Sequence, residues 1–307
     1  MNFNEQYKKY LSVIGNRIEK YFESFDYTAL QKNVFEAMKY AICGGGKRIR
    51  PVLTLAVSNM LGGLSSNAEY VALAVECVHN YSLIHDDLPC MDNDDLRRGR
   101  ATCHKVEEIL ETGGIKKDIA LLAGDGLLNT AFEILSADNG FESLSPSARL
   151  EIIRCLSGAS GVLGMIGGQV VDLQAENRSD ITADELLYLH KNKTGALIRA
   201  AVRCGAICGG ADSSIAAALD EYAESLGLAF QIKDDILDVV GCTEVLGKPI
   251  GSDADCGKST FVTLFGLDGA KDYLVSETNK AKVALEPLGE KARFLSELAD
   301  FLLNRNV

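Results

Sequence analysis

Apolar residues recur every three or four positions along most of the chain, the spacing that places them on one face of an α-helix. Alternating apolar and polar runs bounded by turns, the pattern of half-buried strands, do not occur. Gly44-Gly45-Gly46 ends one segment, and Pro89 interrupts another because proline lacks the amide donor of a helix interior. The pattern predicts helices over residues 4–24, 28–43, 51–61, 67–87, 103–111, 116–136, 146–164, 183–208, 212–239, 270–285 and 288–304.

The helical segments are separated only by short stretches rich in Gly, Asp or Ser. The chain has no internal repeat, no low-complexity tract and no linker of domain-separating composition. We therefore expect residues 1–307 to form one all-α domain, a helical bundle. Small residues recur over 155–168 and 196–217, which suits close helix approach or an oligomer interface.

Composition excludes several classes of protein. With 47% hydrophobic and 24% charged residues, the chain of 307 residues is ordinary for a globular protein and not disordered. Its net charge of -12 argues against nucleic-acid binding, which normally needs a basic face. Any cluster of Lys and Arg in so acidic a chain is therefore a candidate site for an anionic ligand.

Location is predicted from the cysteines and the apolar runs. The nine cysteines are odd in number and form no CxxC pair, which favours reduced thiols in a cytoplasmic protein. The N-terminal residues carry mixed charges and lack the apolar core of a signal peptide. No uncharged apolar run reaches ~18 residues, so we expect no membrane-spanning segment.

A first acidic cluster follows an apolar helix and contains Asp86, Asp87 and Asp92. An isolated run of this kind is more often a solvated turn. Here the carboxylates fall at a helix C-terminus, where the helix dipole disfavours anions unless cations bind. Hard oxygen ligands suit Mg²⁺ that also holds a phosphate. Arg97 and Arg98 follow directly, and arginine fits phosphate oxygens, although plain surface pairing with the carboxylates remains an alternative.

A second acidic cluster lies inside an apolar helical segment. Asp234 and Asp238 are four residues apart and share a helix face, with Gln231 one turn earlier. Carboxylates on such a helix are costly to bury without metals or other partners. Two clusters of this kind in one chain make a solvated polar stripe the weaker reading.

Basic residues that could bind an anion occur at several separate positions along the sequence. Lys47, Arg48 and Arg50 follow the three glycines, whose backbone can approach an anion closely. The spacing is not that of a P-loop. His79 precedes Asp86 by two helical turns and so projects from the same face. Further cations are Lys193, Lys248 and Lys258; each alone is more often a solvated surface charge.

Taken together, these residues resemble the trans-isoprenyl diphosphate synthases, in particular their bacterial short-chain members. The resemblance covers nearly the whole chain. Its motifs occur in the family's order: GGKRIRP (45–51), SLIHDDLPCMDNDDLRRG (82–99), GGQVVDL (167–173), KTGALI (193–198) and LAFQIKDDILDVVG (228–241). It implies an all-α isoprenoid-synthase fold, with helices around a deep central cavity and the two aspartate clusters facing across its mouth. It also implies a homodimer.

The resemblance assigns roles to the quoted residues. Asp86, Asp92 and Asp234 would bind Mg²⁺, about three ions per site with Mn²⁺ as an alternative, and Asp87, Asp235 and Asp238 would support them. The allylic diphosphate would be held by Arg97, Lys193, Lys248 and Lys258. The diphosphate of isopentenyl diphosphate would be held by Lys47, Arg50, His79 and Arg98. Thr194, Gln231 and the Lys193 carbonyl would direct negative dipoles at a carbocation.

The implied reaction is the Mg²⁺-dependent head-to-tail condensation of isopentenyl diphosphate with dimethylallyl and then geranyl diphosphate. It would proceed by ionisation, condensation and elimination and give (2E,6E)-farnesyl diphosphate. Product length in the family depends on side-chain bulk just before the first aspartate cluster. Tyr81 and Ser82 occupy those positions and resemble the pattern that gives a C15 product.

Several alternatives remain open at this stage. A geranylgeranyl (C20) or longer-chain synthase would keep every motif. A non-catalytic partner subunit of a heteromeric synthase would be expected to have lost one aspartate cluster, a terpene cyclase would lack the basic residues at 47–50, and a simple Mg²⁺- or Ca²⁺-binding protein leaves the lysines unexplained. The chain departs from many relatives at Ala101, where proline is common, and at Arg305-Asn306-Val307, which lacks a terminal lysine.

Overall fold

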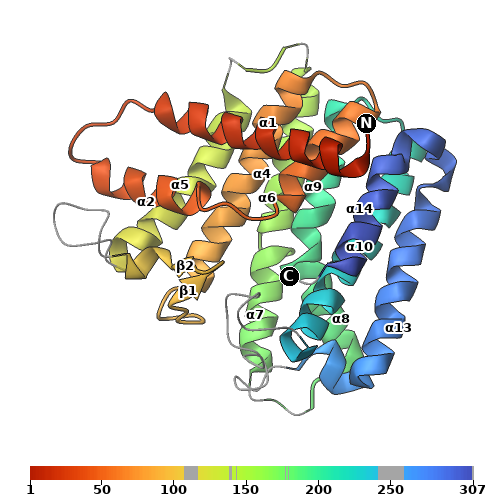
Figure 1. Cartoon of the computed structure of the whole chain (residues 1–307). Coiled ribbons are helices and arrows are strands. Elements are labelled where there is room, and N and C mark those ends of the chain that lie inside the picture. Colours follow the sequence, from red (N-terminus) through yellow and green to blue (C-terminus); the bar gives the residue numbers. More distant parts are fainter. Residues whose placement is uncertain are drawn as a thin grey trace.

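The computed structural model is almost entirely helical, which confirms the all-α prediction (Figure 1). It describes residues 1–106, 117–137, 140–142, 144–176, 178, 180–240 and 259–305. The helices are α1 (Phe3–Glu23), α2 (Lys32–Ile42), α3 (Ile49–Met60), α4 (Ser65–Asp86), α5 (Lys117–Ser136), α6 (Pro146–Ser160), α7 (Met165–Ala175), α8 (Ala183–Lys193), α9 (Gly195–Cys208), α10 (Ser213–Val240), α13 (Phe261–Ala284) and α14 (Arg293–Asn304). Short 3₁₀ helices span Cys103–Lys105 and Glu286–Ala292.

Several helices begin at side-chain caps. Asn2 and Thr182 each form a capping box with the glutamate three residues later, Glu5 and Glu185. These caps satisfy backbone amides that have no partner in the first turn of a helix. Ser145 caps α6, where Pro146 occupies the first turn without loss of a hydrogen bond.

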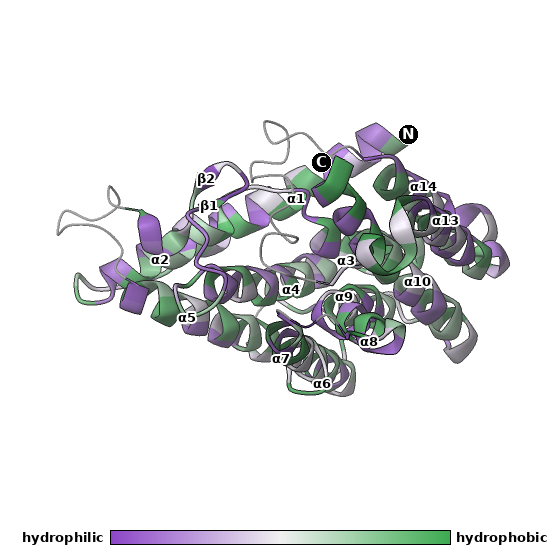
Figure 2. Cartoon of the chain, turned by 90° about the horizontal axis from the view of Figure 1, so that it is seen from below, coloured by the Kyte–Doolittle hydropathy of each residue, from purple (hydrophilic) through white to green (hydrophobic). Residues whose placement is uncertain are grey.

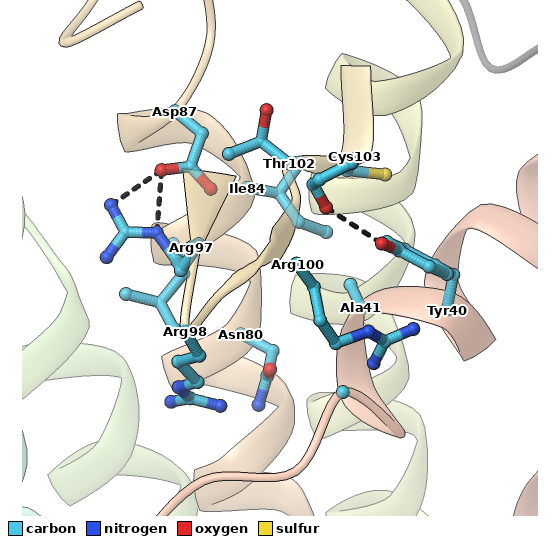
Figure 3. Close-up of a pocket in the computed structure, with 13 residues that line it drawn as sticks. Tyr40, Ala41, Asn80, Ile84, Asp87, Arg97, Arg98, Arg100, Thr102 and Cys103 are labelled. Atoms are coloured by element: carbon cyan, nitrogen blue, oxygen red, sulfur yellow. Dashed lines mark hydrogen bonds and ion pairs between the residues drawn. The ribbon is translucent and has the colours of Figure 1, made fainter. Parts of the chain in front are cut away.

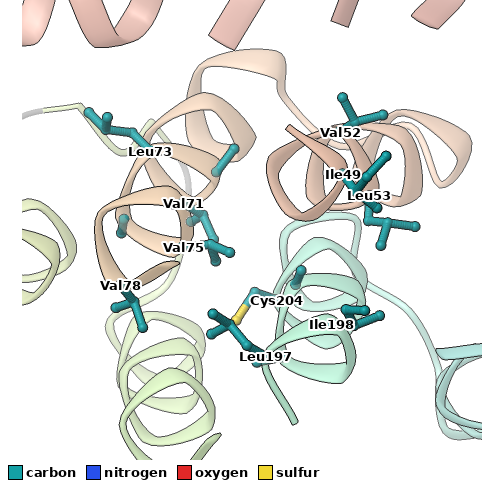
Figure 4. Close-up of a cluster of buried hydrophobic side chains, with 14 of the residues drawn as sticks. Ile49, Val52, Leu53, Val71, Leu73, Val75, Val78, Leu197, Ile198 and Cys204 are labelled. Carbon is teal, nitrogen blue, oxygen red and sulfur yellow. The ribbon is translucent and has the colours of Figure 1, made fainter. Parts of the chain in front are cut away.

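Helix α4 lies at the centre of the larger core. It packs against α1, α2, α3, α5 and α9, and it is apolar on most of its circumference, as a helix surrounded by others must be. Figure 4 shows where α3, α4 and α9 meet, with Val75 and Leu197 among the side chains between them. This packing fixes the C-terminal end of α4, where the first aspartate cluster begins.

A second, smaller apolar cluster supports the other acidic segment. It joins α7, α8, α10 and α13 and includes Leu186, Ile232, Ile236 and Phe261. In Figure 1 α7 and α8 lie in the lower part of the molecule and α13 runs along its right side. The chain's C-terminal end returns from α14 towards α10. Both aspartate clusters therefore emerge from packed helices rather than from free loops.

The structure corrects several of the predicted elements. The segment 183–208 is not one helix, because the chain breaks at Thr194 between α8 and α9. Helix α7 was not predicted. The last long helix begins at Phe261 rather than 270 and bends at Gly266, whose φ is +70°. Only a 3₁₀ turn forms within the described part of 103–111.

A two-stranded ribbon is also present although no strand was predicted. Strand β1 (Leu96–Arg97) pairs antiparallel with β2 (Arg100–Ala101), in the register Leu96 opposite Ala101. Arg98 and Gly99 turn the chain with φ of +55° and +72°. The ribbon is too short to show the alternation by which strands are recognised in a sequence.

Two stretches, Lys117–Ser136 and Pro146–Ala175, are long and apolar enough by composition to cross a membrane. This is weak evidence for a span, because core helices of soluble proteins meet the same criterion. Only 44% and 28% of their apolar windows are buried within this chain.

Candidate active site

The first aspartate cluster is folded back onto the end of α4. After Asp86 the chain turns, and the Asp92 amide donates to the Asp86 carbonyl at 2.9 Å. Burial raises the pKa of the Asp86 carboxyl, and the charges of Asp92 and Asp172 act in the same direction, whereas those of Lys193 and Arg97 oppose the rise. Several carboxylates and two cations thus surround Asp86.

Asp87 has a different environment from its neighbour. Its side chain is 5% exposed and accepts from Arg97, with oxygen–nitrogen distances of 2.6 and 2.5 Å (Figure 3). Burial raises its pKa to about 6 despite the adjacent guanidinium. Asp87 thus holds the ribbon's arginine in place, beside a cavity of about 50 Å³ that Tyr40 and Arg100 also line.

Asp172 on α7 is a site residue that the sequence reasoning missed. Its Oδ2 lies 2.5 Å from Lys193 Nζ. The two helices can approach this closely because Gly168 has no side chain. A Cβ at this position would lie only 2.2 Å from the Lys193 backbone nitrogen and would clash with it. The signal was available in GGQVVDL, which contains both Gly168 and Asp172, but the pairing joins residues that are distant in sequence.

The second cluster is built at the end of α10. Asp235 is buried: its Oδ1 accepts from Gln231 Nε2 at 3.1 Å and its Oδ2 accepts from the Phe261 amide at 2.9 Å. The Gln231 amide oxygen in turn accepts from Thr194 Oγ1 at 2.8 Å. Asp238 is buried as well. Asp235 therefore organises its neighbours, while Asp234 is the more exposed carboxylate.

The C-terminal end of the chain reaches this cluster. Arg305, which was noted only because a terminal lysine is missing after it, donates to Asp234 Oδ1 at 2.7 Å and to the Phe230 carbonyl at 3.0 Å. Its guanidinium lies 4.1 Å from the centre of the Phe230 ring, a cation–π contact. A basic group thus closes one side of the second cluster.

Arg48 fixes the conformation of the glycine-rich loop that begins at Gly44. The other cations of this loop are Lys47 and Arg50. Gly45 and Gly46 have φ of +77° and +110°, and Arg48 itself has φ of +49°. Arg48 forms a buried ion pair with Glu76 and donates to the Ile42 carbonyl. Its charge is therefore compensated inside the protein, in contrast to that of Arg50.

Arg50 and His79 form the centre of a cationic cluster. Arg50 Nη1 lies 3.4 Å from His79 Nε2, and Arg50 Nε is buried without a hydrogen-bond partner among the described residues. Burial and the charges of Arg50, Arg98, Arg48 and Arg97 hold the pKa of His79 well below its usual range, so the ring is neutral. Because arginine only donates, the His79 nitrogen facing it is the acceptor.

Lys47 belongs to the same cluster. Burial lowers its pKa to about 8, Arg305 and Arg98 act in the same direction, and Asp234 opposes. Burial likewise lowers the pKa of Arg50 to about 10, with Asp234 among the opposing charges. The basic loop therefore faces the second aspartate cluster, and the excess of buried positive charge calls for an anionic ligand.

A metal would have to be held jointly with such a ligand. No group of three His, Cys, Asp or Glu side chains in the described residues forms a complete metal site. The available donors are carboxylate oxygens, with Asp86 and Asp92 side by side and Asp234 opposite the basic loop. One or two carboxylates completed by phosphate oxygens is the usual coordination of Mg²⁺, so the residues fit that ion.

The predicted chain-length residues lie one turn deeper than Asp86. Tyr81 is buried, packs edge-on against His85 at 5.7 Å, and its hydroxyl has no partner among the described residues. Burial and the charge of Asp86 raise its pKa to about 12. Ser82 is half-buried, and its hydroxyl donates to the His79 carbonyl at 2.9 Å. Lys248 and Lys258 lie outside the described residues.

Comparison with known proteins agrees with this geometry. A family model described as polyprenyl synthetase matches residues 31–290. The farnesyl diphosphate synthase of Escherichia coli (strain K12) is 47% identical over 277 residues, 89% of this chain and 89% of that protein.

Two solved structures extend the comparison to the fold. An FPP/GFPP synthase from Zymomonas mobilis, in an apo structure, aligns with a TM-score of 0.85 and 36% identity, covering 98% of this chain and 99% of that one. A geranyltransferase from Helicobacter pylori complexed with magnesium and isoprenyl diphosphate gives 0.79 and 33% over 97% and 96%. The resemblance expected from the motifs is confirmed, and the chain belongs to the polyprenyl synthetase family of prenyltransferases.

Proposed function

We propose that the protein condenses isopentenyl diphosphate with dimethylallyl and then geranyl diphosphate to give farnesyl diphosphate. The observation that carries this proposal is that a cluster of buried cations and two clusters of carboxylates belong to the same site. The cationic cluster around Arg50 and His79 can bind an anion. The carboxylates of Asp86 and Asp234 can bind a cation, although Asp234 already pairs with Arg305 through Oδ1. A pair of diphosphate substrates with magnesium satisfies both. The E. coli relative at 47% identity carries the name of this activity.

The allylic diphosphate would be held on the side of Asp86. Asp86, Asp92 and Asp234 would hold Mg²⁺, which when bound supplies the charge that neutralises a departing diphosphate. Lys193, Arg97, Lys248 and Lys258 would donate to the diphosphate oxygens. The contact between Lys193 and Asp172 at 2.5 Å keeps the ammonium aimed beside Asp86 before substrate arrives.

Ionisation of the allylic C–O bond leaves a carbocation that needs negative dipoles nearby. The hydroxyl of Thr194, the amide oxygen of Gln231 and the Lys193 carbonyl lie together at the break between α8 and α9. Fixed dipoles stabilise a developing charge without reorganisation. The alkene of isopentenyl diphosphate then attacks the cation, and the released diphosphate accepts the proton that is lost, so no protein base is required.

Isopentenyl diphosphate would bind at the cationic cluster. Lys47, Arg50 and Arg98 would pair with its diphosphate, and neutral His79 would orient the Arg50 guanidinium by accepting from it. Arg98 is held by donation to the Gly45 carbonyl at 2.5 Å. In this proposal the two diphosphates would bind on opposite sides of the site, with their hydrocarbon ends between them.

The chain length of the product is proposed from Tyr81. A buried ring one turn beneath Asp86 limits the space for a growing prenyl chain, which favours a C15 product. The alternative is a longer product, and the Zymomonas relative is itself described as an FPP/GFPP synthase. The size of the Tyr81 side chain is the feature that separates the two.

We also propose that the protein is a homodimer. Helices α5, α6 and α7 lie along the lower side of Figure 2. These helices, with the turn between α6 and α7, carry apolar side chains that are exposed in this chain. These side chains are Leu121, Leu122, Leu150, Val162, Leu163, Ile166, Val170 and Leu173. A second copy would cover them, since exposed apolar side chains gathered on neighbouring helices mark an interaction site. This also accounts for the two helical stretches whose composition resembles membrane spans.

Domain organisation and location complete the proposal. Residues on both sides of the family match, such as Tyr10, Ile14 and Leu298, belong to the same apolar cluster as α4, which supports one domain over 1–307. The seven cysteines of the described residues are free thiols, in keeping with a cytoplasmic protein.

Product analysis tests the function. The purified protein is incubated with Mg²⁺, labelled isopentenyl diphosphate and either dimethylallyl or geranyl diphosphate, and the dephosphorylated products are resolved by length. We expect a dominant C15 alcohol from both starters, and a loss of at least about a hundredfold in rate for Asp86→Ala and for Asp234→Ala with the fold intact. C20 or longer products would overturn the chain-length proposal, and no product would indicate a non-catalytic partner subunit.

A further inference from the structure

His190 on α8 is a buried residue to which the proposed reaction gives no role. Its side chain is 5% exposed, and neither ring nitrogen has a hydrogen-bond partner among the described residues. Burying unpaired polar atoms destabilises the folded state, so such atoms are rare in native proteins. A structural purpose alone would be served better by an apolar side chain of the same size.

The surroundings of His190 fix the direction of its ring. The imidazole stacks on the Phe261 ring, with centroids 5.4 Å apart and planes inclined by 19°. In this orientation Nε2 lies 3.5 Å from Asp235 Oδ2. The separation is longer than a good hydrogen bond but needs only a small movement to become one. His190 therefore stands directly behind Asp235, on the side away from Gln231.

Asp235 determines how Gln231 is oriented. A carboxylate only accepts hydrogen bonds, so the Gln231 amide must turn its NH₂ group towards Asp235 and its oxygen towards Thr194. If Asp235 rotates, the Gln231 NH₂ group loses the acceptor that fixes its direction, and the amide can turn round. The positive end of the amide would then face the position of the carbocation.

These contacts form two parallel links between the end of α8 and the facing helix α10. His190 and Thr194 are one turn apart at the end of α8, where the Thr194 amide donates to the His190 carbonyl. Gln231 and Asp235 are one turn apart on α10. One link joins His190 to Asp235, and the other joins Thr194 to Gln231.

We propose that His190 is a positioning residue for carbocation stabilisation. Together with the Phe261 amide, which donates to the same carboxylate oxygen, His190 Nε2 holds Asp235 in place. Asp235 in turn holds the Gln231 oxygen towards the cation. The inference rests on the proposed condensation reaction. The contact tightens when substrates bind, as catalytic hydrogen bonds commonly do. Because the oxygen interacts with charge that exists only after ionisation, loss of His190 lowers kcat and leaves KM nearly unchanged.

Three variants at this position test the proposal. His190→Phe keeps the stacked ring without its nitrogens, His190→Gln places an amide nitrogen near Nε2, and His190→Asn reaches only the Nδ1 position. We expect kcat to fall about tenfold in the Phe and Asn variants, with both KM values within about twofold, and to be largely retained in the Gln variant. Lys191→Ala, which removes a surface pair with Glu224, is the matched control on the same helix.

A double-mutant cycle separates positioning from general damage. In a Gln231→Ala background the change His190→Phe should alter kcat by less than about twofold, because the oxygen that it positions is gone. Equal tenfold losses in both backgrounds, or wild-type kcat in the Phe and Asn variants, would overturn the proposal. If the Phe variant does not fold, the Gln and Asn pair decides. Absence of farnesyl product from the wild-type protein would instead overturn the proposed function.

Discussion

At the scale of single residues, identical side chains receive different tasks from their surroundings. Asp86 stands among carboxylates and cations, whereas Asp87 holds Arg97 and Asp235 holds Gln231. Arg48 and Arg50 differ in the same way. Arg48 forms an ion pair with Glu76, whereas Arg50 Nε is buried without a hydrogen-bond partner among the described residues and could bind a ligand. The roles therefore follow from burial and partners and not from residue type.

The pH dependence of isopentenyl diphosphate binding is expected to report Lys47. Its pKa of about 8 means that the ammonium is charged below pH 8 and largely neutral at pH 9. A diphosphate favours the charged form, so binding must take up a proton above pH 8 and KM rises there, by up to about tenfold per pH unit. Steady-state kinetics from pH 7 to 9.5 measure this.

The matched variant for that experiment is Lys47→Arg, whose guanidinium stays charged throughout the range. It should remove the rise in KM for isopentenyl diphosphate. A profile unchanged from wild type would show that another group titrates.

Replacement of Tyr81 by alanine is expected to lengthen the product. The change removes a buried ring beneath Asp86 and opens space for further isoprene units. Chain-length analysis should show C20 and longer alcohols at the expense of C15. Tyr70→Ala, three turns earlier on the same helix, serves as the control, and a C15 profile retained in Tyr81→Ala would contradict the assignment.

At the scale of elements, the decisive feature is the break between α8 and α9. Thr194 interrupts a segment whose apolar pattern is continuous, and α7 packs against the break through Gly168. Lys193 and Thr194 consequently project into the site from a helix end, where the backbone carbonyl is also available. A continuous helix would have turned them along its side.

Gly168→Ala should damage both stability and activity. The added methyl would meet the Lys193 backbone at 2.2 Å, and backbone cannot move aside as a flexible side chain can. We expect a loss of about 1–3 kcal/mol in the free energy of unfolding, and a lower kcat because Lys193 is displaced. Thermal and urea unfolding with parallel kinetics measure both.

Gly15→Ala provides the comparison for that variant. This glycine lies in α1 with no atom within 4 Å of an added Cβ, so alanine should be neutral or stabilising by up to about 1 kcal/mol. Equal behaviour of the two variants would contradict the importance of the close approach at Gly168.

At the scale of the whole molecule, we propose that a second copy of the chain covers the exposed apolar side of α5, α6 and α7. Val162 and Leu163 at the turn between α6 and α7 are 73% and 89% exposed. Replacing both by glutamate should raise the dimer dissociation constant by at least about a hundredfold, because two charges would be buried without partners. Light scattering coupled to size exclusion measures the mass; a monomeric wild-type protein would contradict the homodimer.

Local chemistry allowed much of this protein to be predicted from its sequence. Helical periodicity depends on nearby residues, so α1, α4, α5 and α10 were predicted nearly to their ends. The motifs predicted the family correctly, because their residue types and their order along the chain are specific to the chemistry of that family.

Other features were decided only by tertiary structure. The break at Thr194 and the unpredicted helix α7 arise from packing against each other, and the pairs of Lys193 with Asp172 and Asp234 with Arg305 join residues far apart in the chain. A sequence specifies which side chains exist, but burial and distance between remote segments set their partners and pKa values. The separate tasks of Asp86, Asp87 and Asp235 could therefore be assigned only once the helices were in place.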